Sequence, residues 1–164
     1  MICGLSGSGK TELVCRLLTH FRAQKLKLAT IKHAHAHFDL DQAGKDSWRH
    51  RHAGASEVLI ASMNRWALIH EQKPAMPPHL PTLLAKLAPV DLVLIEGFKR
   101  TICPKIEVRR PGYQGPELWR SDPAILACAS EQPIPDGPCF LKLDDLRAIA
   151  DFILSHAIPA EQIG

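Results

Sequence analysis

Eight consecutive residues near the start of the chain match the pattern G-x-x-x-x-G-K-[ST] in full: Gly4-Leu5-Ser6-Gly7-Ser8-Gly9-Lys10-Thr11. This pattern strongly constrains the fold, because it belongs to a glycine-rich loop that joins a strand to a helix. The glycines let backbone N–H groups converge on a phosphate, and the following helix adds the positive end of its dipole. The sequence therefore predicts a phosphate site at the first strand–helix turn of an α/β domain.

The loop also predicts which residues hold a nucleotide and its metal ion. Lys10 is expected to reach the β- and γ-phosphate oxygens, and the Thr11 hydroxyl is expected to take one Mg²⁺ position. The predicted phosphate-binding residues are Ser6, Gly7, Ser8, Gly9, Lys10 and Thr11. Only residues 1–3 precede the loop, whereas a strand usually spans about five residues, so the central strand is expected to be short unless the natural start lies upstream.

Downstream of the loop, strand-like runs alternate with helical patterns, which favours a largely parallel sheet. Two β-rich runs within 57–71 predict an antiparallel hairpin that interrupts this alternation. We expect a single P-loop NTPase-like α/β domain over 1–164, a mostly parallel sheet flanked by helices with a hairpin insertion at 57–71. Strands are predicted over 26–32, 90–95, 106–109 and 125–129, and helices from about residue 10 to 21, over 44–53, over 82–88 and over 146–153, with Asp144 as the last N-cap.

Two acids flank the most strand-like segment of the chain, Asp91 at its start and Glu96 at its end. Ligands of parallel α/β sheets bind at the carboxyl ends of the strands, so Glu96 is the better candidate and Asp91 is expected at the strand entry. The acids available for the metal shell and for positioning water are Asp39, Asp41 and Glu96. We therefore predict Asp41 and Glu96 as catalytic residues, and Thr11 and Glu96 as metal ligands.

The cations that would assist phosphoryl transfer are less well defined. Arg49, Arg51 and Arg100 are all eligible to stabilise charge on the γ-phosphoryl group, and none is singled out, so slow turnover is expected. Five further basic residues are candidate contacts for an anionic ligand or belong to ordinary solvated surface: Lys32, Lys99, Lys105, Arg109 and Arg110.

Composition argues against several other classes of function. The net charge is only +3 and aromatic residues make up 5% of the chain, which argues against a nucleic-acid coat or a base-stacking platform. No apolar run approaches the roughly 18 residues of a membrane helix. The five cysteines form no C-x-x-C pair and resemble the reduced thiols of a cytosolic protein. We expect a cytoplasmic protein without nucleic-acid or membrane partners.

Three alternating histidines, His33, His35 and His37, share one side of an extended chain. That arrangement is compatible with Zn²⁺ or Ni²⁺, but no cysteine or spaced histidine pair completes a closed tetrahedral site. The other interpretation is a loop whose imidazoles hydrogen-bond a ligand or neighbouring carboxylates. Both interpretations remain open from the sequence.

Several motifs together resemble one family, molybdopterin-guanine dinucleotide biosynthesis protein B (MobB). They are the loop at 4–11, T-I-K-H-x-H-x-x-F-D-x-D at 30–41, G-K-D-S-x-R-H-R-x-A-G-A at 44–55, and a strand ending in E-G-F-K at 91–99 followed by K-I-E-V at 105–108. The resemblance covers roughly 2–154, and the G-K-D-S-x-R-H-R segment is its specific part. It implies a homodimeric GTP-binding protein with weak GTPase activity, which acts as an adapter for the enzyme that joins GMP to molybdopterin.

The resemblance carries over to individual residues, with departures. It implies that Gly7, Gly9, Lys10 and Thr11 bind phosphates and Mg²⁺, and Glu96 matches the strand-end acid of the family. The family's signature also includes residues without a settled role, namely Asp41, Lys45, Asp46 and Arg49. Ala43 stands where the family often has proline, and Glu131 stands where aspartate is common. Preference for GTP over ATP rests on the resemblance alone, because the chain has no N-K-x-D motif.

Three alternatives to a GTP-hydrolysing adapter remain. The first is a small-molecule kinase or ligase of the same fold, although no lid of paired arginines is evident. The second is a GTPase chaperone for nickel insertion, suggested by the alternating histidines. The third is an adapter that binds the nucleotide only as a structural ligand. The apolar hairpin at 57–71 is compatible with sheet extension across a dimer or with packing on its own core.

Overall fold

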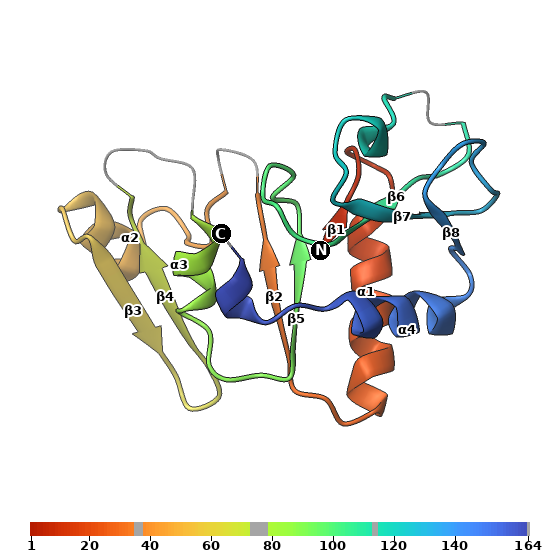
Figure 1. The fold of residues 1–164 in the computed structure, drawn as a ribbon. Coiled ribbons are helices and arrows are strands. Elements are labelled where there is room, and N and C mark those ends of the chain that lie inside the picture. Colours follow the sequence, from red (N-terminus) through yellow and green to blue (C-terminus); the bar gives the residue numbers. More distant parts are fainter. Residues whose placement is uncertain (35–37, 73–78, 113–114, 164) are drawn as a thin grey trace. The chain divides into compact units, whose positions relative to one another are not determined.

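The computed structural model describes residues 1–34, 38–72, 79–112 and 115–163, and the chain divides into two compact units. The first unit comprises Met1–His33 and His79–Gly164, and the second comprises Ala34–Pro78. The first unit contains the glycine-rich loop, and the second contains the predicted hairpin. Figure 1 shows the secondary structure of each unit.

The first unit is built on a six-stranded parallel sheet with the strand order β2-β5-β1-β6-β7-β8. This confirms the mostly parallel sheet that the alternating pattern predicted. The first strand lies between β5 and β6 and is short, as expected, because the loop begins directly after Cys3. The strands are β1 (Ile2–Cys3), β2 (Leu28–Lys32), β5 (Leu92–Glu96), β6 (Lys105–Val108), β7 (Ile125–Ser130) and β8 (Cys139–Lys142).

Two helices, α1 (Lys10–Ala23) and α4 (Leu146–His156), contact each other and pack on one face of this sheet, and α4 crosses α1 in Figure 1. The predicted periodicity of α1 is confirmed, because Leu13, Leu17 and Phe21 are fully buried in the core on that face. The opposite face of β2 and β5 is covered by α3 (Leu80–Leu84) and the short helix η2 (Ala160–Gln162). No helix in the described part of the chain combines the length and apolar character needed to cross a membrane.

Most predicted elements are present with bounds shifted by one to three residues, and further differences occur at α4, α3 and β8. The helix α4 is capped by Asp145 rather than Asp144, because the Asp145 carboxylate accepts the N–H of Ala148 at 3.0 Å. The helix α3 spans Leu80–Leu84 rather than the predicted 82–88, so it both begins and ends earlier. Pro81 lies in its first turn, where the fixed φ of proline is compatible with a helix. The strand β8 was not predicted, because a four-residue edge strand with one buried side chain, Leu141, shows little periodicity.

The second unit consists of α2 (Asp46–His52) and a two-stranded sheet of β3 (Glu57–Ala61) and β4 (Trp66–His70). The strands are antiparallel, with Val58 opposite Ile69 and Leu59 opposite Leu68, which confirms the predicted hairpin. The helix packs against β3, yet it has no buried residue of its own. Most large apolar side chains of this unit therefore remain exposed: Phe38, Leu40, Leu59, Ile60, Met63, Trp66 and Leu68.

The five cysteines are all free thiols. Cys3, Cys103 and Cys128 are buried, whereas Cys15 and Cys139 are exposed. Burial raises the pKa of Cys3 to about 12 and that of Cys128 to about 12, because it disfavours the thiolate. The three buried thiols therefore serve as small apolar side chains of the core.

Candidate functional site

The glycine-rich loop leaves the end of β1 and turns into the first residue of α1, as the motif predicted. The structure describes all residues of 6–11. Within this stretch, the backbone N–H of Ser8 donates to the carbonyl oxygen of Leu5 at 3.2 Å. The other amides of this stretch have no acceptor among the described residues. An array of unpaired N–H groups at the start of a helix suits an anionic ligand.

The interior of the loop is tightly packed and contains one unsatisfied hydroxyl. Ser8 is 2% exposed, and its Oγ has no hydrogen-bond partner among the described residues. A Cβ placed on Gly4 would lie 2.7 Å from that Oγ and 2.7 Å from the carbonyl oxygen of Val108, so only glycine fits at this position. A buried hydroxyl without a partner costs about 1–3 kcal/mol, which a bound ligand would offset.

Lys10 extends back across the loop. Its Nζ donates to the carbonyl oxygen of Leu5 at 2.6 Å, so the ammonium group lies over the backbone that would hold a phosphate. Partial burial lowers the pKa of Lys10, and the Glu96 carboxylate opposes this effect. The ammonium group is thus placed where it can neutralise the charge of a phosphate.

Thr11, Glu96 and Lys32 form a connected polar cluster beside the loop. Thr11 Oγ1 donates to Glu96 at 2.9 Å (Oε1) and 3.2 Å (Oε2). Lys32 Nζ donates to Thr11 Oγ1 at 3.2 Å and lies 3.4 Å from Glu96 Oε1. The register of β2 and β5 pairs Lys32 with Glu96, which explains why these side chains meet. The structure brings together Thr11 and Glu96, and their role as metal ligands stays a prediction.

Asp91 lies at the opposite end of the same strand, as expected, and its carboxylate accepts the backbone N–H of Lys27 at 2.7 Å. This bond links the entry of β2 to the entry of β5. Asp91 is therefore separated from the loop by the length of a strand, and its contact here is structural.

A second basic side chain, Arg110, lies against the loop. Gly9 has a φ of +92°, and a Cβ at this position would lie 2.7 Å from Nε and 2.9 Å from Nη2 of Arg110. Gly9 is therefore required both for its left-handed backbone and for this close approach. The sequence grouped Arg110 with four other basic residues, and only the packing of the segment after β6 against the loop distinguishes it.

Two of the other candidate anion contacts have structural partners instead. Lys105 is buried and donates to Asp122 at 2.5 Å and to the carbonyl oxygen of Lys99 at 2.8 Å. Arg109 Nη1 donates to the buried carboxylate of Glu107 at 3.1 Å. These bonds hold the loops that surround β6, and an anionic ligand would have to compete with carboxylates for both cations.

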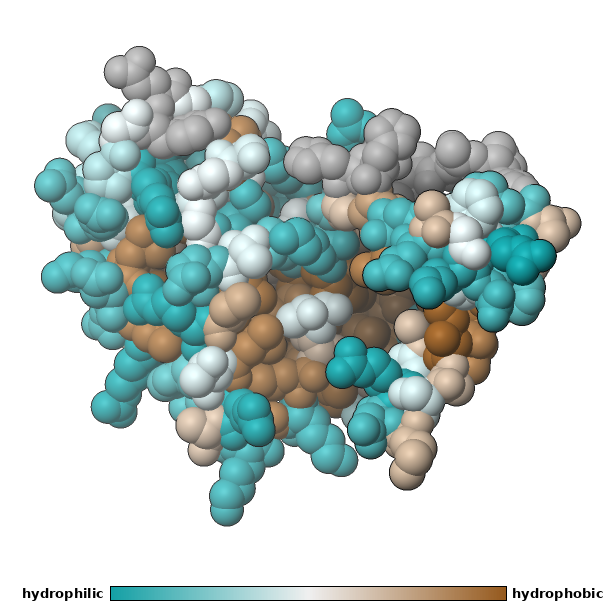
Figure 2. Space-filling model, turned by 180° about the vertical axis from the view of Figure 1, so that it is seen from behind, coloured by the Kyte–Doolittle hydropathy of each residue, from teal (hydrophilic) through white to brown (hydrophobic). Residues whose placement is uncertain are grey.

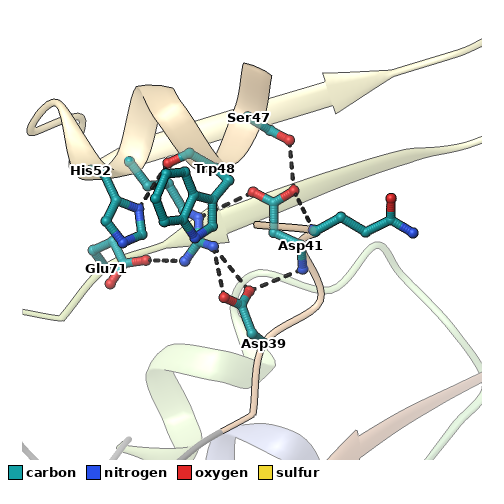
Figure 3. Close-up of polar contacts among 8 residues, drawn as sticks. Asp39, Asp41, Ser47, Trp48, His52 and Glu71 are labelled. Atoms are coloured by element: carbon teal, nitrogen blue, oxygen red, sulfur yellow. Dashed lines mark hydrogen bonds and ion pairs between the residues drawn. The ribbon is translucent and has the colours of Figure 1, made fainter. Parts of the chain in front are cut away.

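In the second unit, Arg51 binds three carboxylates (Figure 3). It donates to Glu71 at 2.8 Å, to Asp39 at 2.9 Å and 3.0 Å, and to Asp41 at 3.3 Å. Asp41 also accepts the Ser47 hydroxyl at 2.7 Å. Hydrogen bonds to Glu71 and Asp39 raise the pKa of Arg51, while the backbone N–H of Asp41 and the guanidinium of Arg51 lower the pKa of Asp39. The cluster joins the segment before α2 to the residue after β4.

The histidine-rich stretch is described only in part. His35 and His37 lie outside the described residues, so the metal hypothesis for the three histidines stays untested. The ring of His33 contacts that of Phe98, with the ring centroids 4.9 Å apart. Gly97, with a φ of +97°, makes room for it, because a Cβ there would lie 2.8 Å from His33 Cβ. Within the described ranges, no group of three or more His, Cys, Asp or Glu side chains is arranged to hold a metal ion.

Ser130 lies at the carboxyl end of β7, and the next residue is Glu131, which stands where the family commonly has aspartate. Because the sheet is parallel, this is the edge that also carries the glycine-rich loop. The Ser130 hydroxyl is buried and donates to the carbonyl oxygen of Gln132 at 2.7 Å, whereas Glu131 is exposed. Of the two, Glu131 is the side chain accessible to a ligand.

Comparison with known proteins supports the resemblance noted in the sequence. The profile of molybdopterin guanine dinucleotide synthesis protein B matches residues 1–131. The molybdopterin-guanine dinucleotide biosynthesis adapter protein of Haemophilus influenzae is 39% identical over 153 residues, which is 93% of this chain and 85% of the relative. The adapter protein of the same description from Escherichia coli is 36% identical over 152 residues, 91% of this chain and 87% of the relative.

Solved structures agree with the sequence comparison. A crystal structure described as molybdopterin-guanine biosynthesis protein B has a TM-score of 0.72 and 30% identity, covering 94% of this chain and 96% of the other. Bacillus subtilis MobB has a TM-score of 0.68 and 25% identity, with 96% of each chain covered. Since sequence profile, full-length relatives and fold all agree, the chain belongs to the molybdopterin guanine dinucleotide synthesis protein B (MobB) family.

Proposed function

We propose that this chain is a GTP-binding adapter protein in the formation of molybdopterin guanine dinucleotide. The observation that carries the proposal is the loop at 4–11, with unpaired amides, a buried unsatisfied Ser8 hydroxyl, and Lys10 extended over the backbone. The relatives in Haemophilus influenzae and Escherichia coli are described as adapter proteins of this biosynthesis. The partner of the adapter would be molybdopterin or its guanylyltransferase.

The residues of the site suit a nucleotide bound with Mg²⁺. The loop amides of 6–11 and the Lys10 ammonium group would hold the phosphates, and Ser8 would add a hydroxyl. Thr11 and Glu96 offer oxygen ligands of the kind that Mg²⁺ takes. The ion, when bound, would neutralise charge on the phosphate oxygens. Guanine rather than adenine is proposed from the family, and Glu131 is the exposed candidate for its recognition.

We expect at most a weak GTPase activity. Glu96 would position water near the metal ion, and its location at the end of β5 beside Thr11 supports this role. Asp41 stays a predicted catalytic residue, although its carboxylate accepts bonds from Ser47 and Arg51 that would have to open. Arg51, one of the three eligible cations, is held by carboxylates of its own unit. Arg49 and Arg100 stay eligible to supply the missing charge, as do a partner protein and a second copy of the chain.

The proposal is tested by titrating non-hydrolysable GTP and ATP analogues, each with and without Mg²⁺, in a calorimeter. We expect the GTP analogue to bind with Mg²⁺, and the ATP analogue to bind at least about tenfold more weakly, a difference of about 1.4 kcal/mol. Equal or tighter binding of ATP would favour the small-molecule kinase instead. The adapter role is checked by adding the chain and GTP to a guanylyltransferase, whose rate of dinucleotide formation should rise.

We also propose that the protein acts as a homodimer, in which the hairpin contributes to the interface. Leu59 lies opposite Leu68, and Ala61 lies opposite Trp66, so these four side chains share one face of the hairpin. Leu59 is 61% exposed and Trp66 is 67% exposed. Figure 2 shows that apolar side chains reach the surface at several places in the view from behind. A two-stranded hairpin is marginally stable alone, and burial against a second copy would stabilise this face.

Replacing Leu59 and Trp66 together with lysine is expected to convert the dimer to a monomer, because two desolvated charges would face the partner. Sedimentation equilibrium measures the change. Met63→Lys is the matched control, since Met63 is a fully exposed apolar residue between the two strands of the same hairpin. Wild-type protein that is monomeric at micromolar concentration, or a double variant that remains dimeric, would contradict the proposed interface.

A further inference from the structure

The cluster of Thr11, Glu96 and Lys32 already contains a cation. Lys32 Nζ lies 3.2 Å from Thr11 Oγ1 and 3.4 Å from Glu96 Oε1, the same two side chains that would bind Mg²⁺. We propose that Lys32 and Mg²⁺ are alternative occupants of the position beside Thr11 and Glu96, and that Lys32 moves to the terminal phosphate when Mg²⁺ binds with the nucleotide. This inference rests on the proposed function and adds a residue that sets the dependence of binding on the metal ion.

The ammonium group and Mg²⁺ compete for the same oxygen atoms. The Thr11 hydroxyl donates its proton to Glu96 and accepts a hydrogen bond from Lys32, so a lone pair that a metal ion would use is engaged. The side chain of Glu96 is only 11% exposed, so solvent screens repulsion between two cations weakly at this place. Lys32 therefore has to withdraw from the pair before the metal ion can bind.

Lys32 is the movable member of the cluster. Thr11 is fixed in the first turn of α1, and the carboxylate of Glu96 is held at the end of the buried strand β5. The Lys32 side chain is 56% exposed, and its flexible aliphatic stem allows the ammonium group to move without a change in the backbone. Lys10 is not equivalent, because its ammonium group donates to the Leu5 carbonyl oxygen.

This exchange has two measurable consequences of opposite sign. Without a metal ion, Lys32 neutralises part of the phosphate charge, so its removal should weaken nucleotide binding. With nucleotide bound, Lys32 opposes the entry of Mg²⁺, so its removal should lower the metal concentration needed for half-saturation. A lysine that contacted only phosphate, away from the metal position, would not produce the second effect.

The experiment compares wild-type protein with Lys32→Met by calorimetry, in two titrations. In the first, a non-hydrolysable GTP analogue is titrated into the protein in EDTA. In the second, MgCl₂ is titrated into the protein loaded with the analogue, in buffer without EDTA. For Lys32→Met we expect the metal-free affinity for the analogue to fall about tenfold. We expect the half-saturating Mg²⁺ concentration to fall about three- to tenfold, which is the size of effect that one partly exposed charge produces. Lys32→Arg, which keeps the charge, should retain most of the metal-free affinity. Lys27→Met is the matched control, because Lys27 is an exposed lysine at the other end of β2.

Each other outcome contradicts a specific step. A Lys32→Met protein with an unchanged or higher half-saturating Mg²⁺ concentration would overturn the inference and leave the proposed function intact. Equal loss of affinity with and without Mg²⁺ would make Lys32 an ordinary phosphate contact, which also overturns it. Failure of the wild-type protein to bind the analogue under any condition would instead overturn the proposed function, and this inference with it. Thermal unfolding of each variant confirms that its fold is retained.

Discussion

Lys10→Ala is expected to lower the affinity for a GTP analogue with Mg²⁺ at least about 100-fold, because truncating one member of a desolvated charge pair typically costs 2–5 kcal/mol or more. The ammonium group of Lys10 already lies over the loop, where Nζ donates to the Leu5 carbonyl oxygen at 2.6 Å. The fold should be unaffected, since the Lys10 ammonium group makes this one hydrogen bond among the described residues. Calorimetry measures the affinity, and circular dichroism checks the fold.

Arg22→Ala is the matched control for that experiment. Arg22 lies in the last turn of the same helix and is exposed, so its loss changes the net charge by the same amount at the far end of α1. We expect its affinity for the analogue to stay within about twofold of the wild type, because a screened charge at that distance contributes little. If Lys10→Ala binds the GTP analogue as tightly as this control, the loop at 4–11 is not the nucleotide site.

Glu107→Ala is expected to lower the free energy of unfolding by about 3–5 kcal/mol, because it leaves buried polar partners without their acceptor. Glu107 is 1% exposed and accepts from Arg109 at 3.1 Å, from the backbone N–H of Leu118 at 3.3 Å and from that of Trp119 at 3.1 Å. For a chain of this size the melting temperature should fall by about 6–20 °C, which thermal unfolding followed by circular dichroism measures.

The control for Glu107 is an acid in an exposed ion pair. Asp151 lies 3.9 Å from Arg147 on the surface of α4, and both side chains are largely exposed. Such pairs contribute about 0–1 kcal/mol, so Asp151→Ala should shift the melting temperature by only a few degrees. If Glu107→Ala is no more destabilising than Asp151→Ala, the buried carboxylate does not hold the segment that contains Leu118 and Trp119.

The sequence predicted the features that depend on neighbouring residues. The glycine-rich loop is contiguous, so phosphate- and metal-binding roles could be predicted directly for its glycines, Lys10 and Thr11. The buried face of α1 and the presence of the hairpin follow from periodicity, and the position of Glu96 at a strand end follows from the order of apolar residues. Where a signal was weak, as at the four residues of β8 or between the adjacent acids Asp144 and Asp145, local pattern was insufficient.

Tertiary structure decided which distant residues meet. Thr11 and Glu96 are 85 positions apart, and their contact depends on the packing of α1 beside β5. The same holds for Arg110 against Gly9, which depends on the path of the chain after β6. Spacing along a chain carries no distance information once a sheet brings strands together in a nonsequential order. For this reason the sequence alone determined the glycine-rich loop and the phosphate chemistry predicted for it, whereas only the folded sheet could place a lysine, Lys32, beside Thr11 and Glu96, the predicted metal ligands.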